Sequence, residues 1–180
     1  MESKTNRQLG PFTSEELEAM GNHAEDDGLL FCLLRWTGLR ASTAIGLTWG
    51  EVSLDRQQIE YVEHKSPRRI ILPIPAELLS VLSAEHQRRN PRRNEPVLQH
   101  SNGKPFTREY LCRRIVALGR RSGIQHAYPS RFRATFAVDL LLRGVDPFWV
   151  ATLLGVNINS VVRAHPPFVH EIPGWQTPMN

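Results

Sequence analysis

Apolar residues recur at intervals of three or four along most of this chain, which predicts a largely helical protein. Glycines mark where several of these patterns stop: Gly38 follows one apolar run, and Gly144 and Gly155 follow two others. The expected helices cover residues 14–20, 28–36, 41–47, 107–121, 133–143 and 147–154, with one more starting near residue 75. Thr13 or Ser14 is the expected N-cap of the first helix. Beyond residue 167 the regular signals end.

One segment has the period of a β-hairpin. Gln58–Val62 alternates between apolar and polar residues, and Arg69–Ile74 provides a return strand after a turn at Lys65–Pro67. Residues 49–54 are expected to form a turn before the first strand. The predicted fold class is therefore mainly α with a small antiparallel β-sheet, an α+β arrangement.

Length and composition predict one globular domain. The 180 residues are 41% hydrophobic, which is enough to bury a sizeable core. Cys32 and Cys112 lack metal-ligand spacing, so we expect no metal site and no disulfide framework. No apolar run has the length of a membrane span, and we expect a cytoplasmic protein without a membrane partner.

Charge is unevenly distributed. Residues 1–29 hold two of the 22 Lys and Arg residues and seven of the 18 Asp and Glu residues, so the rest of the chain is clearly basic. Arginine often comes in adjacent pairs, at 68–69, 88–89, 92–93, 113–114 and 120–121. Such pairs suit a phosphate backbone, although a solvated basic face is the alternative interpretation.

Two further arginines, Arg40 and Arg133, stand inside otherwise apolar helical patterns. A guanidinium on a buried helix face needs an anion, which is either a carboxylate of the protein or a bound phosphate. Two such arginines, with Lys65 in the hairpin between them, favour phosphate.

Four motifs carry a resemblance to a known family. They are Thr37-Gly38-Leu39-Arg40-Ala41-Ser42, the hairpin lysine, the segment from Arg131 to Leu142, and Val150 to Gly155. In this order they resemble the TGLR segment, catalytic lysine, HxLRHTFA box and LLGH motif of the tyrosine recombinases, the phage-integrase family. The resemblance covers residues 12–168 as a catalytic domain, between an N-terminal tail at 1–11 and a C-terminal tail at 169–180. It implies that the family's core-binding domain is absent from this chain.

The resemblance implies a function in DNA integration and recombination. Family members cut and rejoin double-stranded DNA through a covalent phosphotyrosine, while cationic side chains stabilise the charge on the phosphate oxygens. It assigns this phosphate-binding role to Arg40, Lys65 and Arg133. No metal and no cofactor is implied.

Several catalytic positions depart from the family pattern. Ser130 stands at the position of the first histidine, and Val156 stands at the histidine after the LLG motif. His165 aligns with the histidine beside the nucleophile, which leaves Pro166 or a deletion where the tyrosine belongs. The tyrosines of the chain are Tyr61, Tyr110 and Tyr128. This pattern predicts a site that keeps its anion-binding half and has lost its attacking half.

Three hypotheses follow. The first is a DNA-binding domain with a degenerate site, as a regulator or as the remnant of a mobile element. The second is an active recombinase that uses His165, or a tyrosine supplied in trans, as its nucleophile. The third is a protein-interaction module without DNA affinity. In each case the C-terminal segment could mediate a homo-oligomer.

Overall fold

The computed structural model describes residues 10–62 and 68–170 of the chain. Its first helix, α1 (Ser14–Asn22), begins after Thr13, whose side-chain oxygen accepts a hydrogen bond from the backbone N–H of Glu16. The Glu16 carboxylate accepts one from the Thr13 N–H in return, which completes a capping box. The predicted helix start is confirmed, with Thr13 as its cap.

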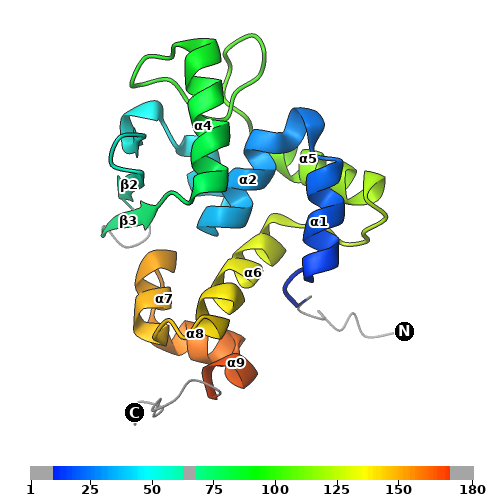
Figure 1. Ribbon diagram of the computed structural model, residues 1–180, viewed down its shortest axis with the longest axis vertical. Helices are drawn as coiled ribbons and strands as arrows, with labels where there is room; N and C mark the ends of the chain where they lie inside the picture. The colour runs from blue at the N-terminus through cyan, green and yellow to red at the C-terminus, as the bar shows by residue number, and fades with distance from the viewer. Residues whose placement is uncertain (1–9, 63–67, 171–180) are drawn as a thin grey trace.

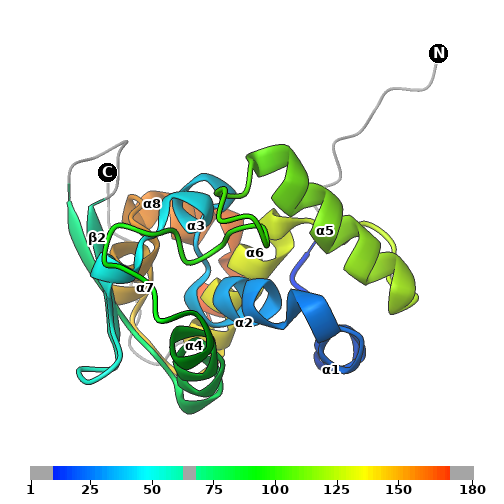
Figure 2. The ribbon, with the colours of Figure 1, turned by 90° about the horizontal axis from the view of Figure 1, so that it is seen from above.

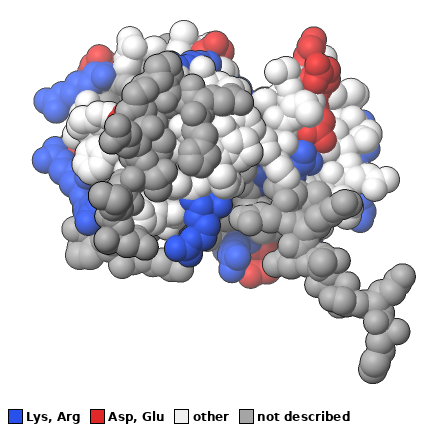
Figure 3. Space-filling view, turned by 90° about the horizontal axis from the view of Figure 1, so that it is seen from below, with Lys and Arg blue, Asp and Glu red and all other residues white. Residues whose placement is uncertain are grey.

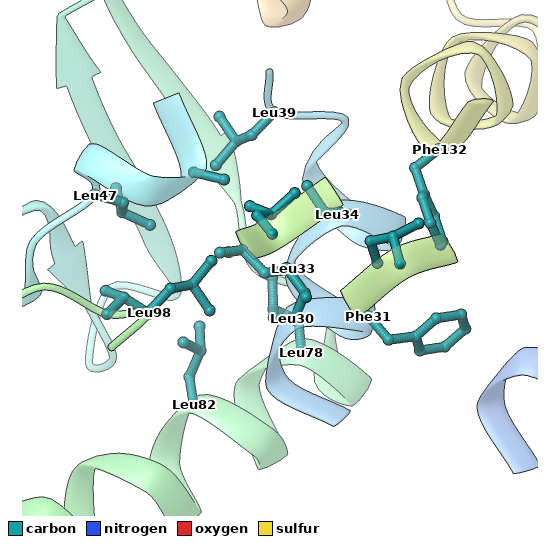
Figure 4. Packing of buried hydrophobic residues seen from close by; sticks show 14 of the residues in the cluster. Leu30, Phe31, Leu33, Leu34, Leu39, Leu47, Leu78, Leu82, Leu98 and Phe132 are labelled. Atoms are coloured by element: carbon teal, nitrogen blue, oxygen red, sulfur yellow. The ribbon is translucent and has the colours of Figure 1, made fainter. Parts of the chain in front are cut away.

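Helix α2 (Gly28–Thr37) lies in the larger of two hydrophobic clusters. The short 3₁₀ turn η1 (Glu25–Asp27) leads into it. Leucines of α2 pack against leucines of α4 (Ala76–Arg89), against Leu39 and Leu47, and near Phe132 of α6 (Pro129–Leu142) (Figure 4). The chain leaves α2 through Gly38 in the left-handed region, with φ 60°, and continues into α3 (Ala41–Gly46). This turn fits the helix stop predicted at Thr37-Gly38.

Three strands form an antiparallel sheet in the order β1-β2-β3. They are β1 (Val52–Ser53), β2 (Gln58–Val62) and β3 (Arg69–Pro73), and the 3₁₀ turn η2 (Trp49–Glu51) precedes them. Ile59 pairs with Leu72 and Tyr61 with Ile70, and these four side chains form the buried face. The hairpin is confirmed, and β1 was not predicted because two residues are too few to show alternation. The turn predicted at Lys65–Pro67 lies outside the described residues.

Two long helices complete the larger cluster. Helix α4 (Ala76–Arg89) follows Pro75, and α5 (Arg108–Arg121) follows Thr107, whose side-chain oxygen accepts a hydrogen bond from the Tyr110 N–H at 3.1 Å. Both helices were predicted. Seen from above, the β-hairpin and α5 lie at opposite sides of the molecule, with α2 between them (Figure 2).

Helix α6 (Pro129–Leu142) belongs to both hydrophobic clusters. Its Phe132 lies in the larger cluster, while Phe136 and Leu141 lie in the smaller one. The helix begins at Pro129 instead of the predicted Arg133, because proline is favoured in a first helical turn, where its missing N–H costs no hydrogen bond. The predicted start was therefore too late.

The smaller cluster is built by α6 and the C-terminal helices, which lie together in Figure 1. They are α7 (Pro147–Leu154), α8 (Ile158–Ala164) and α9 (Pro166–His170). Only α7 was predicted. The expectation that regular structure ends at residue 167 was wrong, since α9 places Val169 in the cluster with no exposure. Helices this short show little periodicity, and packing of their apolar residues stabilises them.

The observed fold class is the predicted one, mainly α with a small antiparallel sheet. None of the helices within residues 10–62 and 68–170 has the length and apolar character needed to cross a bilayer.

Candidate functional site

Arg40 lies at the turn between α2 and α3, in the break that the sequence predicts between the helices at 28–36 and 41–47. It is the N-cap residue of α3, with an extended backbone (φ −64°, ψ 148°), and it is half-buried. The predicted break between the two helices is confirmed, because Gly38 ends α2 in the left-handed region before Arg40 is reached. The turn directs the chain so that Arg40 lies at a pocket instead of on a helix face within the core.

Arg133, on α6, is held by two backbone carbonyl groups. Its Nη1 donates a hydrogen bond to the carbonyl oxygen of Gly38 at 2.9 Å, and its Nη2 donates to that of Leu154 at 2.5 Å. Both carbonyls lie at helix C-termini, where the last carbonyls lack partners within their helix and the macrodipole favours a cation. The side chain therefore joins α6 to the ends of α2 and α7.

A pocket of about 680 Å³ brings the two arginines together. Its lining residues come from the α2–α3 turn, α5 and the start of α6: Leu39, Arg40, Ala41, Ser42, Arg108, Cys112, Tyr128, Pro129, Ser130 and Arg133. The exposed Ser130 lies here too, so the structure places three of the predicted site residues in one pocket. The lining of the pocket therefore includes the hydrogen-bond donors of two arginines and one serine.

Three further residues of the pocket were missed by sequence reasoning: Arg108, Cys112 and Tyr128. Arg108 and Cys112 stand four residues apart on α5, which puts them on one helix face. Helical spacing could have paired these two, but no sequence signal places that face beside the α2–α3 turn. Their role depends on tertiary packing.

The remaining predicted positions lie elsewhere or are not described. Lys65 lies outside the described residues. Val156, His165 and Pro166 are not among the described residues that line the pocket. Val156 packs at the edge of the smaller hydrophobic cluster, and Pro166 begins α9.

His165 ends α8 and is half-buried. Its backbone N–H donates to the carbonyl oxygen of Val161 at 2.9 Å. Burial lowers the pKa of its imidazole, because desolvation penalises the charged form. A neutral imidazole at the end of a helix fits a packing role.

Several of the paired arginines have partners within the protein. Asp27, only 2% exposed, accepts hydrogen bonds from Arg114 at 2.5 Å and from Arg121 at 2.8 Å. The hydrogen bond to Asp27 raises the pKa of Arg114. Two arginines of α5 thus compensate one buried carboxylate. Arg114 and Arg121 therefore have an ion-pair partner within the protein, which neither interpretation of the arginine pairs included.

The adjacent arginines Arg88 and Arg89 also have partners within the protein. Arg88 forms a surface ion pair with Glu85 at 2.6 Å, and Arg89 donates to the carbonyl oxygens of Pro96 and Val97, both at 2.9 Å. On the described part of the face shown in Figure 3, basic side chains form several separate groups with uncharged surface between them. The pocket at Arg40 and Arg133 is therefore a more specific candidate site than the overall basic charge.

Arg131, beside the site, has a structural role. It lies 4.0 Å from the ring centroid of Phe12, and its Nη2 contacts the Glu16 carboxylate at 2.8 Å. Its Nε donates to the carbonyl oxygen of Gly10 at 3.0 Å. These contacts fasten the segment before α1 to the start of α6, beside the pocket.

The family of this chain is shown by its sequence. The sequence model of the phage integrase family matches residues 11–164, and this chain belongs to that family. It is 32% identical over 130 residues to the tyrosine recombinase XerC of Xylella fastidiosa (strain 9a5c), covering 72% of this chain and 44% of the relative. It is 31% identical over 144 residues to the tyrosine recombinase XerA of Thermococcus onnurineus (strain NA1), covering 77% and 50%. The chain thus spans about half the length of these curated relatives.

Solved structures show the same fold. The crystal structure of XerA recombinase matches with a TM-score of 0.79 at 20% identity, over 93% of this chain and 66% of that one. A XerH site-specific recombinase bound to its difH substrate matches with a TM-score of 0.74 at 19% identity, over 87% and 50%. A lambda integrase dimer bound to a COC′ core site matches with a TM-score of 0.69 at 15% identity, over 94% and 62%. The helices and sheet described above are those of the family's recombinases.

Proposed function

We propose that this chain is a DNA-binding domain of the phage integrase family that holds a backbone phosphate without cleaving the strand. The observation that supports it is the pocket in which Arg40, Arg133 and Ser130 meet. Guanidinium groups bind phosphate oxygens through paired, charge-assisted hydrogen bonds. The solved structures of XerH and lambda integrase are DNA complexes, which agrees with a duplex as the ligand.

The absence of cleavage is proposed from the departures at the family's other positions. Ser130 offers a neutral hydroxyl where the family has a histidine, and a neutral donor is about half as strong as a charged one. Val156 has no side-chain donor, and Pro166 has no nucleophile. Lys65 remains a proposed phosphate contact.

A salt titration of duplex binding tests the proposal. Removing the cation from one phosphate contact should reduce the slope of log affinity against log salt by about 0.9. We expect this reduction for Arg40→Gln, and no change for Arg88→Gln, which alters a surface arginine paired with Glu85. Thermal melting identifies any variant that fails to fold. An unchanged slope in a folded Arg40→Gln variant contradicts the proposal.

The proposed absence of strand cleavage needs a separate assay. The chain is incubated with a duplex that carries a phosphorothiolate at a nick, and denaturing electrophoresis then detects protein bound covalently to DNA. We expect no adduct. An adduct that disappears in Arg40→Gln would favour an active recombinase with a substitute nucleophile or one supplied in trans.

A protein-interaction role is a second candidate, favoured by exposed apolar side chains near α7. Leu142 is 62% exposed, and Phe148 and Trp149 are 57% and 59% exposed. The native mass of the full chain and of a chain ending at residue 170 tests a homo-oligomer formed through the C-terminal segment. A monomeric mass for both chains contradicts it. Truncation at 170 keeps Val169, which is buried in the smaller cluster.

A further inference from the structure

Tyr128 is the described tyrosine that lines the pocket. It is 43% exposed and caps the N-terminus of α6, five positions before Arg133. Within residues 10–62 and 68–170, its hydroxyl forms no hydrogen bond to the protein. Tyr61 is buried in the sheet. Tyr110 packs against His100, with ring centroids 4.3 Å apart.

The position of Tyr128 is fixed by its neighbours. Pro129 follows it and restricts its backbone to an extended conformation, observed as φ −128° and ψ 151°. Ala127, before it, is 2% exposed and packs closely on Gly119 of α5, where an added Cβ would collide with the alanine methyl group. The segment that carries Tyr128 is therefore packed against α5.

Arg108 lies on the α5 side of the same pocket. It is exposed, and no carboxylate of the described chain forms an ion pair with it. The pocket lining thus includes arginines from three elements: Arg40 before α3, Arg108 at the start of α5 and Arg133 on α6. None of the family motifs in the sequence contains Arg108 or Tyr128.

We infer that Tyr128 and Arg108 are phosphate-binding residues of this site. The inference rests on the proposed function, since it concerns the same bound phosphate. A phosphodiester carries one negative charge over two nonbridging oxygens, each of which accepts more than one hydrogen bond. The phenol hydroxyl supplies a neutral donor and Arg108 a charged one. Together they provide donors that the family's histidine positions, Ser130 and Val156, supply weakly or not at all.

Two variants separate the contributions in the same salt titration. Tyr128→Phe removes only the hydroxyl, so we expect about tenfold weaker duplex binding, the typical loss for one hydrogen bond to a charged group, with an unchanged salt slope. Arg108→Gln removes a cation, so we expect the slope to fall by about 0.9. Tyr110→Phe and Arg88→Gln are the matched controls and should bind like the unaltered chain.

A double variant tests whether the hydroxyl and Arg40 act on one phosphate. Residues that share a ligand couple, so Tyr128→Phe combined with Arg40→Gln should lose less affinity than the product of the single losses. Fully multiplicative losses would contradict a shared phosphate. A purely structural role of Tyr128 predicts lower thermal stability, which melting of the single variant measures.

The outcomes also separate this inference from the proposed function. If Arg40→Gln weakens binding and both Tyr128→Phe and Arg108→Gln bind normally, the inference alone fails. If Arg40→Gln binds duplex DNA normally, the proposed function of the pocket as a phosphate-binding site is contradicted. A covalent DNA adduct mapped to Tyr128 would overturn the role as a hydrogen-bond donor and make this tyrosine a nucleophile.

Discussion

The guanidinium of Arg133 donates a hydrogen bond to the carbonyl oxygen of Gly38, 2.9 Å away. This bond joins the motif that contains Arg133 to the motif that contains Gly38 and Arg40. Gly38 also lies against the ring of Phe136, one helical turn after Arg133. One glycine thus ends α2, accepts the Arg133 hydrogen bond and gives room to Phe136. The geometry of the pocket depends on this small residue.

Substituting Gly38 should destabilise the fold strongly. A Cβ at this position would lie 2.6 Å from Phe136 Cδ1, and the backbone has φ +60°. Gly144 has φ +77° and open space around the added atom, so Gly144→Ala measures the backbone cost alone. We expect Gly38→Ala to lower the free energy of unfolding by about 1 to 3 kcal/mol more than Gly144→Ala does. Denaturant melts of both variants check this, and equal losses would contradict the clash.

The buried carboxylate of Asp27 provides a second prediction. Arg114 and Arg121, its partners, are 31% and 43% exposed, so they can turn to water when the carboxylate is removed. We expect Asp27→Ala to cost about 2 kcal/mol, less than the ~3–5 kcal/mol for breaking a fully buried pair. Asp26→Ala changes an exposed neighbour and should stay within about 0.5 kcal/mol of the unaltered chain. Urea melts compare the two, and equal effects would remove the special role of Asp27.

The two cysteines should report occupation of the pocket. Burial, and then the charge of Glu77, raise the pKa of the Cys32 thiol, which lowers its thiolate fraction near neutral pH. Cys112 lines the pocket. We expect iodoacetamide to label Cys112 faster than Cys32, and duplex DNA to slow labelling of Cys112 only. Mass spectrometry of the two peptides measures both rates, and unchanged labelling of Cys112 under saturating DNA would place the duplex elsewhere.

His165 should make the protein less stable in mild acid. Because burial lowers its pKa in the folded state, the unfolded chain binds the proton more tightly. Its contribution to stability is complete above the unfolded pKa of about 6.5 and is lost as the pH falls through that value toward the folded pKa. His165→Gln should therefore show a flatter dependence of unfolding free energy on pH between about 7.5 and 5.5. The same slope in both proteins would show that His165 titrates normally.

Sequence reasoning predicted the helices that are long enough to show a period, and the β2–β3 hairpin. It missed β1, α8 and α9, whose conformation depends on contacts with distant residues. It also proposed Arg40, Ser130 and Arg133 as site residues from their motifs, and these three line one pocket. Arg108 and Tyr128 carry no motif, and tertiary packing such as that of Ala127 on Gly119 brings their elements together. The partners of Arg114 and Arg121 were missed for the same reason, since Asp27 is far away in the sequence.

The second hydrogen bond of Arg133, to Leu154 at the end of α7, makes ligand affinity depend on the folding of the C-terminal helices. A chain in which only the larger cluster had folded would hold the α2–α3 turn, and with it Arg40, in place. It would have no α7 terminus to anchor Arg133, so its pocket would be incomplete. Tight binding of an anion would then mark those molecules whose C-terminal helices have already docked, and the ligand would select the fully folded chain over its partly folded forms.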